Sequence, residues 1–239
     1  MEKNWGSMID FLYVLGSGSE YNNLELRLSL RSIDKYALNL GRVFVIGEKP
    51  DWIKNVVHIP VNDDLTSENN VFKKILIACK SGISENFVFM NDDFFMLNEF
   101  NAETYPYFIN GDVKYIENPS RYQMVLNNSI VYLQSKGIED VLDFRVHCPI
   151  RYNRKKFLSL ESVFNQQKDK ESGYSPRILY GNLFVDEYIE APDCKIWGNE
   201  FCETEQRCIS TKNDGIDVLV VLLKKFKKKS KYEKKDVDI

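Results

Sequence analysis

Two adjacent acids, Asp92 and Asp93, follow Asn91 where a short apolar segment at residues 87–90 ends. Neighbouring carboxylates repel each other, so burying them requires a cation or several hydrogen-bond donors close by. Hard cations such as Mg²⁺ or Mn²⁺ bind carboxylate oxygens and are often shared with substrate phosphates. The sequence therefore predicts a metal-diphosphate site at Asp92 and Asp93, with Asn91 shaping the turn. A plain strand-to-turn corner is the alternative, because Asn and Asp favour turns.

A glycine-serine segment follows another apolar stretch, at residues 11–15. Its members are Gly16, Ser17, Gly18 and Ser19. Glycine lets the backbone approach a ligand closely, and successive N–H groups can hold a phosphate. The spacing is neither that of a Walker loop nor that of a full G-x-G-x-x-G motif. We expect this segment to bind the phosphates of the ligand whose diphosphate would share the metal at Asp92 and Asp93. A flexible strand-to-helix turn is the alternative.

Arg27 and Arg31 lie four residues apart in a segment with helical spacing, so they share one face of the helix. The planar guanidinium group matches the geometry of phosphate oxygens. The pair is therefore predicted to position a diphosphate. The alternative is a solvated helix face on which the arginines pair with Glu25 and Asp34.

His147 is the histidine whose surroundings suit catalysis, because charged residues flank it and Pro149 stiffens the chain that follows. An imidazole that titrates near neutral pH is the usual general base for a hydroxyl. We predict that His147 deprotonates an acceptor hydroxyl and that Arg151 stabilises charge nearby. A structural histidine bonded to the backbone is the alternative, and His58, inside an apolar run, is expected to be of that kind.

The elements that must position these residues alternate along the first hundred residues. Strands are expected at residues 11–15, 43–46, 56–60 and 87–90, and helices at about 22–36 and 68–80. This β-α-β-β-α-β order predicts an α/β fold of the Rossmann-like type, with a mostly parallel central sheet and helices on both faces. Ligands of such sheets bind at the carboxyl ends of the strands, where the Gly-Ser segment and the acids would meet.

The second half is less regular. We expect a lid at residues 101–111, a helix at 121–136, a mobile loop at 161–175 and a last helix from about Gly215. The chain is interpreted as one transferase domain. Within it, residues 9–100 would bind the nucleotide sugar, residues 101–214 would form an irregular acceptor lobe, and residues 215–239 would form a helix with a basic tail.

Composition limits the class of partner. A net charge of −3 argues against a dedicated nucleic-acid binder. Five cysteines without close pairs fit a reducing compartment, and no apolar run is long enough to cross a bilayer. We therefore expect a cytoplasmic protein. Eight lysines at residues 224–235 follow an apolar helix and suggest peripheral contact with an anionic membrane. A solvated helix end is the alternative.

Three segments together resemble the Stealth family of sugar-1-phosphate transferases, which act in capsule synthesis and are related to the lysosomal-enzyme GlcNAc-phosphotransferase. Residues 23–33 and 89–95 are similar to the second conserved region of that family, and residues 147–151 with Lys155 and Lys156 are similar to the third. The similarity covers about residues 10–157. The family's opening Asp motif has no clear counterpart, since Asp10 precedes the first strand, and the fourth region is not evident.

The resemblance implies a function. It assigns the acids after the fourth strand and nearby arginines to the donor phosphates, and the histidine of the third region to the chemistry. The β-α-β pattern that ends in acids also looks like the nucleotide half of a GT-A glycosyltransferase. The prediction is a metal-dependent transferase that moves a glycosyl or sugar-1-phosphate group from a nucleotide sugar to a glycan or glycolipid hydroxyl. A non-catalytic nucleotide- or sugar-binding protein on the same fold is the alternative.

Overall fold

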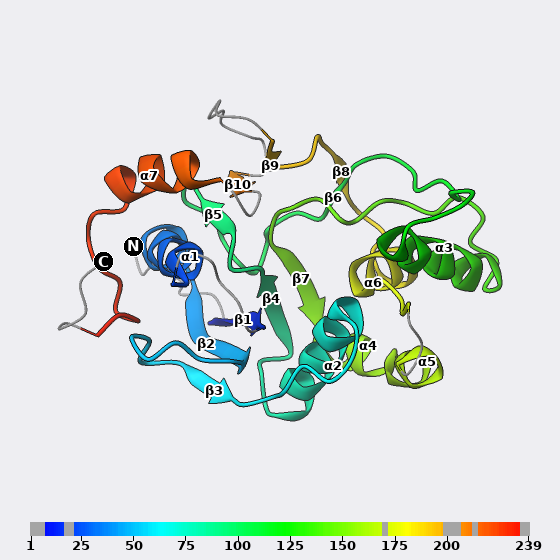
Figure 1. Ribbon diagram of the computed structural model, residues 1–239, viewed down its shortest axis with the longest axis horizontal. Helices are drawn as coiled ribbons and strands as arrows, with labels where there is room; N and C mark the ends of the chain where they lie inside the picture. The colour runs from blue at the N-terminus through cyan, green and yellow to red at the C-terminus, as the bar shows by residue number, and fades with distance from the viewer. Residues whose placement is uncertain (1–7, 17–21, 169–171, 198–206, 212–214, 235–239) are drawn as a thin grey trace, which may run out of the picture.

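A central sheet of five strands organises the computed structural model, which describes residues 8–16, 22–168, 172–197, 207–211 and 215–234. The strand order is β3-β2-β1-β4-β7 (Figure 1). The bounds are β1 Ile9–Leu15, β2 Leu40–Gly47, β3 Val57–Ile59, β4 Asn86–Met90 and β7 Ile150–Asn153. The first four strands are parallel, and β7 is antiparallel to β4.

Helices cover both faces of this sheet. Alternate side chains of a strand point to opposite faces, so Phe11 and Tyr13 of β1 face α1 (Leu24–Tyr36), whereas Leu12 faces α2 (Ser67–Lys80). Two further helices, α4 (Arg154–Leu158) and α6 (Pro176–Phe184), pack on the α2 side. The mixed α/β class, the mostly parallel sheet, the helices on both faces and the β-α-β-β-α-β order are therefore confirmed.

A second sheet of three strands joins the first at the predicted acids. Its order is β5 (Phe94–Met96), β10 (Cys208–Thr211) and β9 (Lys195–Ile196). The chain passes directly from β4 to β5 through residues 91–93. Buried serines of α1 hold β5 in place: the Ser29 hydroxyl donates to the Phe94 carbonyl at 2.6 Å, and the Ser32 hydroxyl accepts from the Met96 amide at 3.0 Å. The loop that carries the acids is thus fixed at both ends.

The region after β5 is more ordered than expected. It holds β6 (Phe108–Ile109), which pairs with β8 (Ile189–Glu190), and the helices α3 (Arg121–Gln134) and α5 (Glu161–Gln167). The prediction of a loop over residues 161–175 is wrong for its first part. Val163 and Phe164 are buried, and the Phe164 ring lies 5.2 Å from that of Phe72. Few apolar residues therefore suffice to dock a short helix in a polar sequence.

The last helix, α7 (Ile216–Lys225), packs its apolar face inward. Val218, Leu219 and Leu222 are buried against β5, β10 and α1. Val220 and Val221 remain exposed. Ile216 is exposed as well, so α7 keeps three exposed apolar side chains, and peripheral contact with a membrane stays a prediction.

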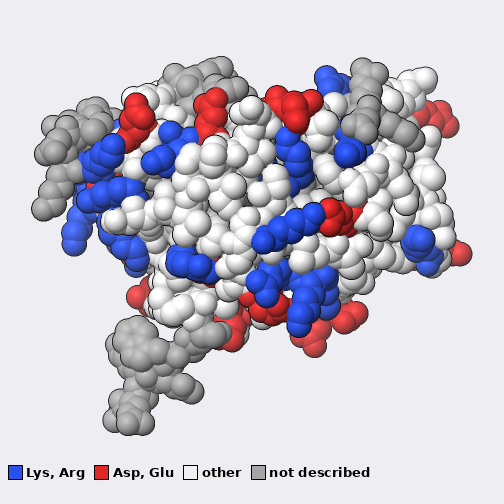
Figure 2. Space-filling model, turned by 90° about the horizontal axis from the view of Figure 1, so that it is seen from below, with Lys and Arg blue, Asp and Glu red and all other residues white. Residues whose placement is uncertain are grey.

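Charged side chains of both signs are mixed over the face seen in Figure 2, and positive ones gather at the end of the molecule where the chain termini lie.

Within the described ranges, the structure contains no helix of the length and apolarity needed to span a membrane.

Candidate functional site

Part of the predicted site, namely Gly16, the two acids and His147, lies at the carboxyl edge of the central sheet. Tyr13 of β1 is level with Met90 of β4, so the residues that follow these strands meet at one edge. The antiparallel β7 begins at this same edge, since Ile150 lies opposite Phe89. His147, three residues before β7, therefore returns to the acids from far along the chain.

Burial raises the pKa of Asp92 to about 7, and the negative charges of Asp93 and Glu25 add to the effect. The pKa of Asp93 is also raised by burial, although the Ser210 hydroxyl, which donates to Asp93 Oδ2 at 2.5 Å, opposes the shift together with the charges of Lys195 and His147. The charges acting on Asp92 are thus those of other acids. This loop holds negative charge at a free-energy cost that a bound cation would offset.

The acids fit a divalent cation that is completed by other ligands. Within the described residues, no three His, Cys, Asp or Glu side chains are grouped so as to hold a metal by themselves. Mg²⁺ is commonly bound by one or two carboxylates together with substrate phosphates and water. Asp92 and Asp93 meet that requirement, so the donor set suits a cation that arrives with a phosphate.

His147 is held by partners on three sides. Its Nδ1 lies 2.8 Å from Asp193 Oδ2, and its backbone N–H donates to Asp193 Oδ1 at 2.8 Å. Arg177 Nη1 donates to the carbonyls of Val146 and Cys148, which flank the histidine, at 2.9 Å each. Because Nδ1 is engaged by a carboxylate, Nε2 is the ring nitrogen left to accept a proton.

Hydrogen bonds from His147 lower the pKa of Asp193 despite its partial burial, which acts in the opposite direction. Asp193 is therefore ionised over the neutral range and orients the imidazole ring. The edge of that ring also contacts Phe94, with the ring centres 6.5 Å apart at 83°. This arrangement is that of a general base with an orienting carboxylate.

Two cavities are lined by the segment from Arg145 to His147. The smaller, of about 170 Å³, also reaches Asn91 and Arg177. The larger, of about 470 Å³, is also lined by Asp193, by Lys195 of β9 and by Trp197. His147 lines both cavities.

The structure describes only the first residue of the glycine-serine segment. Gly16 is described, and Ser17, Gly18 and Ser19 lie outside the described residues. A Cβ on Gly16 would lie 2.9 Å from Asp63 Oδ2. Asp63 pairs with the buried Lys74 at 2.5 Å, and Lys74 Nζ donates to the Leu15 carbonyl at 2.6 Å. Gly16 thus lies at the carboxyl edge of β1, beside the ion pair of the exposed Asp63 with Lys74, and phosphate binding by this segment stays a prediction.

Arg27 and Arg31 occupy a different place from the predicted one. The Arg31 guanidinium donates to both carboxylate oxygens of Glu233 at 2.7 Å and to the Phe226 carbonyl at 2.9 Å. Arg27 lies 3.6 Å from Glu233, and its guanidinium is 4.2 Å from the centre of the Trp52 ring. Both arginines are buried. They face the C-terminal segment, so a phosphate would have to displace Glu233 to reach Arg31.

Arg151 also lies apart from His147. Because it pairs with Val88, its side chain leaves the sheet on the α1 face, where Nη1 donates to the Glu103 carbonyl at 2.7 Å. Its guanidinium lies 4.6 Å from the centre of the Tyr107 ring. It lines a different cavity from those that His147 lines. The predicted partnership is therefore not formed, and Arg177 is the arginine that contacts the histidine segment.

Asp10, at the amino end of β1, pairs with Arg42 at 2.6 Å and so lies at the edge of the sheet opposite the acids. His58 is structural as expected, with Nε2 2.9 Å from the Gly47 carbonyl.

Sequence reasoning missed Asp193, Lys195, Arg177 and Ser210. None lies in a recognisable motif. Asp193 and Lys195 stand in a short polar island, and only the pairing of β9 with β10, Lys195 opposite Ser210, brings that island to Asp93. The sequence does show a short Asp-Cys-Lys-Ile segment between loops, which could have marked these residues. That this segment lies beside Asp93 follows only from the strand pairing in the structure.

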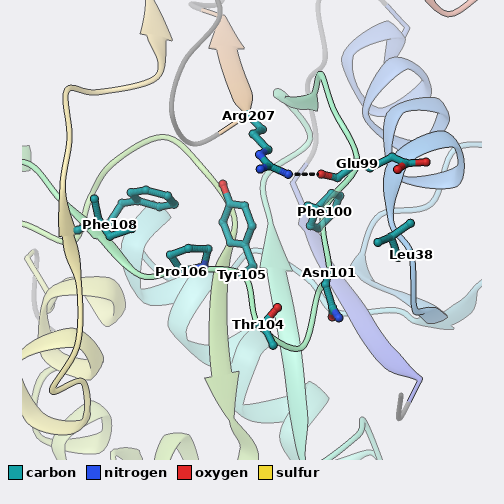
Figure 3. A pocket seen from close by; sticks show the side chains of 10 residues that line it. Leu38, Glu99, Phe100, Asn101, Thr104, Tyr105, Pro106, Phe108 and Arg207 are labelled. Atoms are coloured by element: carbon teal, nitrogen blue, oxygen red, sulfur yellow. Dashed lines mark hydrogen bonds between the residues drawn. The ribbon is translucent and has the colours of Figure 1, made fainter. Parts of the chain in front are cut away.

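A separate cavity of about 480 Å³ opens near Leu38, which precedes β2 at the opposite edge of the sheet (Figure 3). Arg207 donates to the Glu99 carbonyl at 2.7 Å beside it, and Tyr105 stands at its centre. Its lining residues include neither the acids nor His147, so it is not the candidate site.

No protein-family model and no curated protein matches this sequence. Among solved structures, the chain is similar to the galactosyltransferase LgtC in complex with donor and acceptor sugar analogues, at 11% sequence identity and a TM-score of 0.44, over 77% of this chain and 73% of LgtC. It is also similar to the glycosyltransferase GlyE of Streptococcus pneumoniae, at 8% identity and a TM-score of 0.39, over 77% of this chain and 45% of GlyE. These are weak similarities in overall arrangement, and the resemblance to the Stealth family stays a prediction.

Proposed function

We propose that the chain is a transferase that moves a glycosyl or sugar-1-phosphate group from a nucleotide sugar to a hydroxyl of a glycan or glycolipid. One observation carries the proposal: two carboxylates whose pKa values are raised lie at the carboxyl edge of a parallel sheet, and the charge of a carboxylate-bound histidine acts on one of them. Acids whose raised pKa values show that nearby charges offset their own only in part suit a cation shared with phosphates, and the histidine suits proton removal.

Each residue takes a role in this proposal. Asp92 and Asp93 hold Mg²⁺ or Mn²⁺ with the donor diphosphate, and the cation supplies charge neutralisation there when bound. Asn91 shapes the turn. His147 accepts the proton of the acceptor hydroxyl at Nε2, while Asp193 holds the ring and stabilises its positive charge. Arg177 is a positioning residue, since it holds the carbonyls on both sides of His147.

Two bond changes satisfy this arrangement. If the acceptor oxygen attacks the anomeric carbon, the bond from that carbon to the diphosphate oxygen breaks and a nucleoside diphosphate leaves. If it attacks phosphorus, the bond between the two phosphates breaks and a nucleoside monophosphate leaves. In both cases the hydroxyl proton goes to His147, so the leaving nucleotide tells the two reactions apart.

The test incubates the protein with UDP-, CDP-, GDP- and dTDP-sugars and Mn²⁺, with and without glycan acceptors, and identifies the released nucleotide by chromatography. We expect one donor to release a nucleotide, and EDTA to stop the release. Asp93→Ala should abolish Mn²⁺-dependent donor binding measured by calorimetry. His147→Ala should keep donor binding and lower the rate about 10²–10⁴-fold.

The matched control is His58→Ala, which removes the histidine on β3 and should leave the chemical step unchanged. Donor binding without turnover under every condition would contradict the transferase and favour a non-catalytic binding protein. Unchanged turnover in His147→Ala would remove His147 from the chemistry.

A further inference from the structure

The larger cavity beside His147 has an exposed aromatic side chain at its rim. Trp197 is 69% exposed, although tryptophan is usually well buried. Its position follows from strand alternation: Ile196 of β9 is buried in the core, so Lys195 and Trp197 on either side of it point the other way. Both line the cavity, and Lys195 Nζ lies 5.4 Å from the centre of the Trp197 ring.

A second exposed aromatic residue lines the same cavity. Tyr122, at the start of α3, is 52% exposed, and its hydroxyl oxygen accepts a hydrogen bond from Arg145 Nη1 at 3.3 Å. Arg145 is in turn fixed by Asp143 through Nε at 2.9 Å and Nη2 at 2.6 Å. The cavity therefore offers two aromatic faces and a set of planar polar groups whose positions are fixed.

The polar lining is balanced in charge. The charged side chains that line it are two acids, Asp143 and Asp193, and two cations, Arg145 and Lys195. Asp143 forms an ion pair with Arg145, and the backbone N–H of Lys195 donates to Asp193 Oδ1 at 3.3 Å. A cavity with no surplus charge favours a neutral ligand over a phosphate or a sugar acid. A volume of about 470 Å³ is in the range of small-ligand pockets.

We infer that this cavity binds a neutral pyranose of the acceptor, with the sugar ring stacked on Trp197 and one hydroxyl at His147. The C–H face of a pyranose packs on an aromatic ring, and its hydroxyls pair with carboxylate, amide and guanidinium groups. Asp193 links proton removal to sugar binding, because it is hydrogen-bonded to His147 and lies four residues before Trp197. This inference rests on the proposed function, and it makes Trp197 a residue that binds the acceptor and takes no part in the proton transfer.

The first test measures binding without turnover. Saturation-transfer NMR and Trp fluorescence are recorded with lactose, maltose and N,N′-diacetylchitobiose as neutral probes, and with a glucuronic acid disaccharide as the anionic probe. We expect at least one neutral probe to bind, and Trp197→Ala to weaken it at least 10-fold. Trp197→Phe should stay within about 3-fold of the wild type. No binding by any neutral probe, or tighter binding of the anionic one, would overturn the inference.

The second test separates this inference from the proposed function. With a donor that turns over, Trp197→Ala should raise the KM for the acceptor at least 10-fold and leave the KM for the donor, and the slow release of nucleotide to water, unchanged. Tyr115→Ala is the matched control, since Tyr115 is 61% exposed and does not line the cavity. Donor turnover with an acceptor KM unchanged in Trp197→Ala would refute the acceptor subsite and leave the transferase intact. Absence of donor turnover would refute the transferase, and the NMR result would then decide the sugar site alone.

Discussion

The C-terminal cluster of Arg27, Arg31 and Glu233 and the loop at Asp92 and Asp93 both hold shielded carboxylates, but they differ in the charges that surround them. Two arginines face Glu233, whereas the charges that act on Asp92 are those of Asp93 and Glu25. Arg31 meets Glu233 with two hydrogen bonds of 2.7 Å, and these contacts lower the pKa of Glu233 although burial acts to raise it. At the acidic loop, burial and neighbouring acids raise the pKa of Asp92 to about 7. The carboxylate of Glu233 is thus satisfied by partners within the protein, whereas Asp92 has no cation among the charges that act on it, which supports the proposal of a bound cation there.

The two regions also predict opposite pH dependence. The pKa of Glu233 is lowered in the folded state, so its contribution to stability is present above the ordinary value of 4.5 and is lost as the pH falls below it. The pKa of Asp92 is raised, so the folded state holds a proton that the unfolded state releases above the ordinary value of 3.8. Its contribution is therefore lost as the pH rises through about 7.

The largest expected effect is on the C-terminal cluster. Glu233→Ala leaves two buried guanidinium groups without their carboxylate and should lower the free energy of unfolding by about 3–5 kcal/mol. Urea unfolding at pH 7 measures it. Lys231→Ala, which removes the partly exposed pair with Asp34, is the control and should change stability by less than about 1 kcal/mol. A loss below 1 kcal/mol in Glu233→Ala would show that the cluster is not what holds the C-terminal segment.

The next effect is on turnover. Asp193→Asn should lower kcat about 10²-fold, because the imidazole loses the carboxylate that orients it and stabilises its charge. Steady-state kinetics with the active donor measures this, with the KM for the donor expected to stay the same. Asp64→Asn, an exposed acid in another loop, is the control. Full activity in Asp193→Asn would mean that the contact with His147 is structural.

The helices and strands of the first half, and the position of the two acids, were predictable because each depends on the local pattern of apolar and polar residues. Apolar runs that end at Gly16 and Asn91, and the helical spacing of residues 68–80, correspond to β1, β4 and α2. The roles of Arg27 and Arg31 could not be predicted from the sequence. Arg31 contacts Glu233 across a long stretch of sequence, and the spacing of residues on a helix is the same whether its arginines face a phosphate or a carboxylate. Asp193 was missed for the same reason, since its neighbourhood depends on the pairing of short strands.

Asp92→Asn tests the acidic loop without touching Asp93. Because the folded protein is penalised for the ionised carboxylate, the variant should be more stable than the wild type at pH 8 by about 1–2 kcal/mol, and the difference should vanish near pH 4. Thermal unfolding across pH measures it.

Mn²⁺ provides the complementary measurement. The metal should raise the stability of the wild type at pH 8 by up to about 2.7 kcal/mol at 100 times its Kd, and should raise that of Asp92→Asn much less. If the wild type and Asp92→Asn were equally stable at pH 8 without metal, and were stabilised equally by Mn²⁺, the proposal that this loop binds a divalent cation would be contradicted.

The smallest effect on stability is expected at Arg27. A substitution there distinguishes the contribution of Arg27 from that of Arg31, the other arginine that faces Glu233. Its Nη1 is buried without a hydrogen bond and lies 3.6 Å from Glu233, while Trp52 packs against the guanidinium at 4.2 Å. Arg27→Met keeps the apolar stem over Trp52 and removes an unsatisfied donor, so we expect a change within about 1 kcal/mol. Arg31→Met removes the partner of both Glu233 oxygens and should cost at least twice as much. Urea unfolding of both variants compares them directly, and a larger loss in Arg27→Met would show that the charge at 3.6 Å matters more than the hydrogen bonds at 2.7 Å.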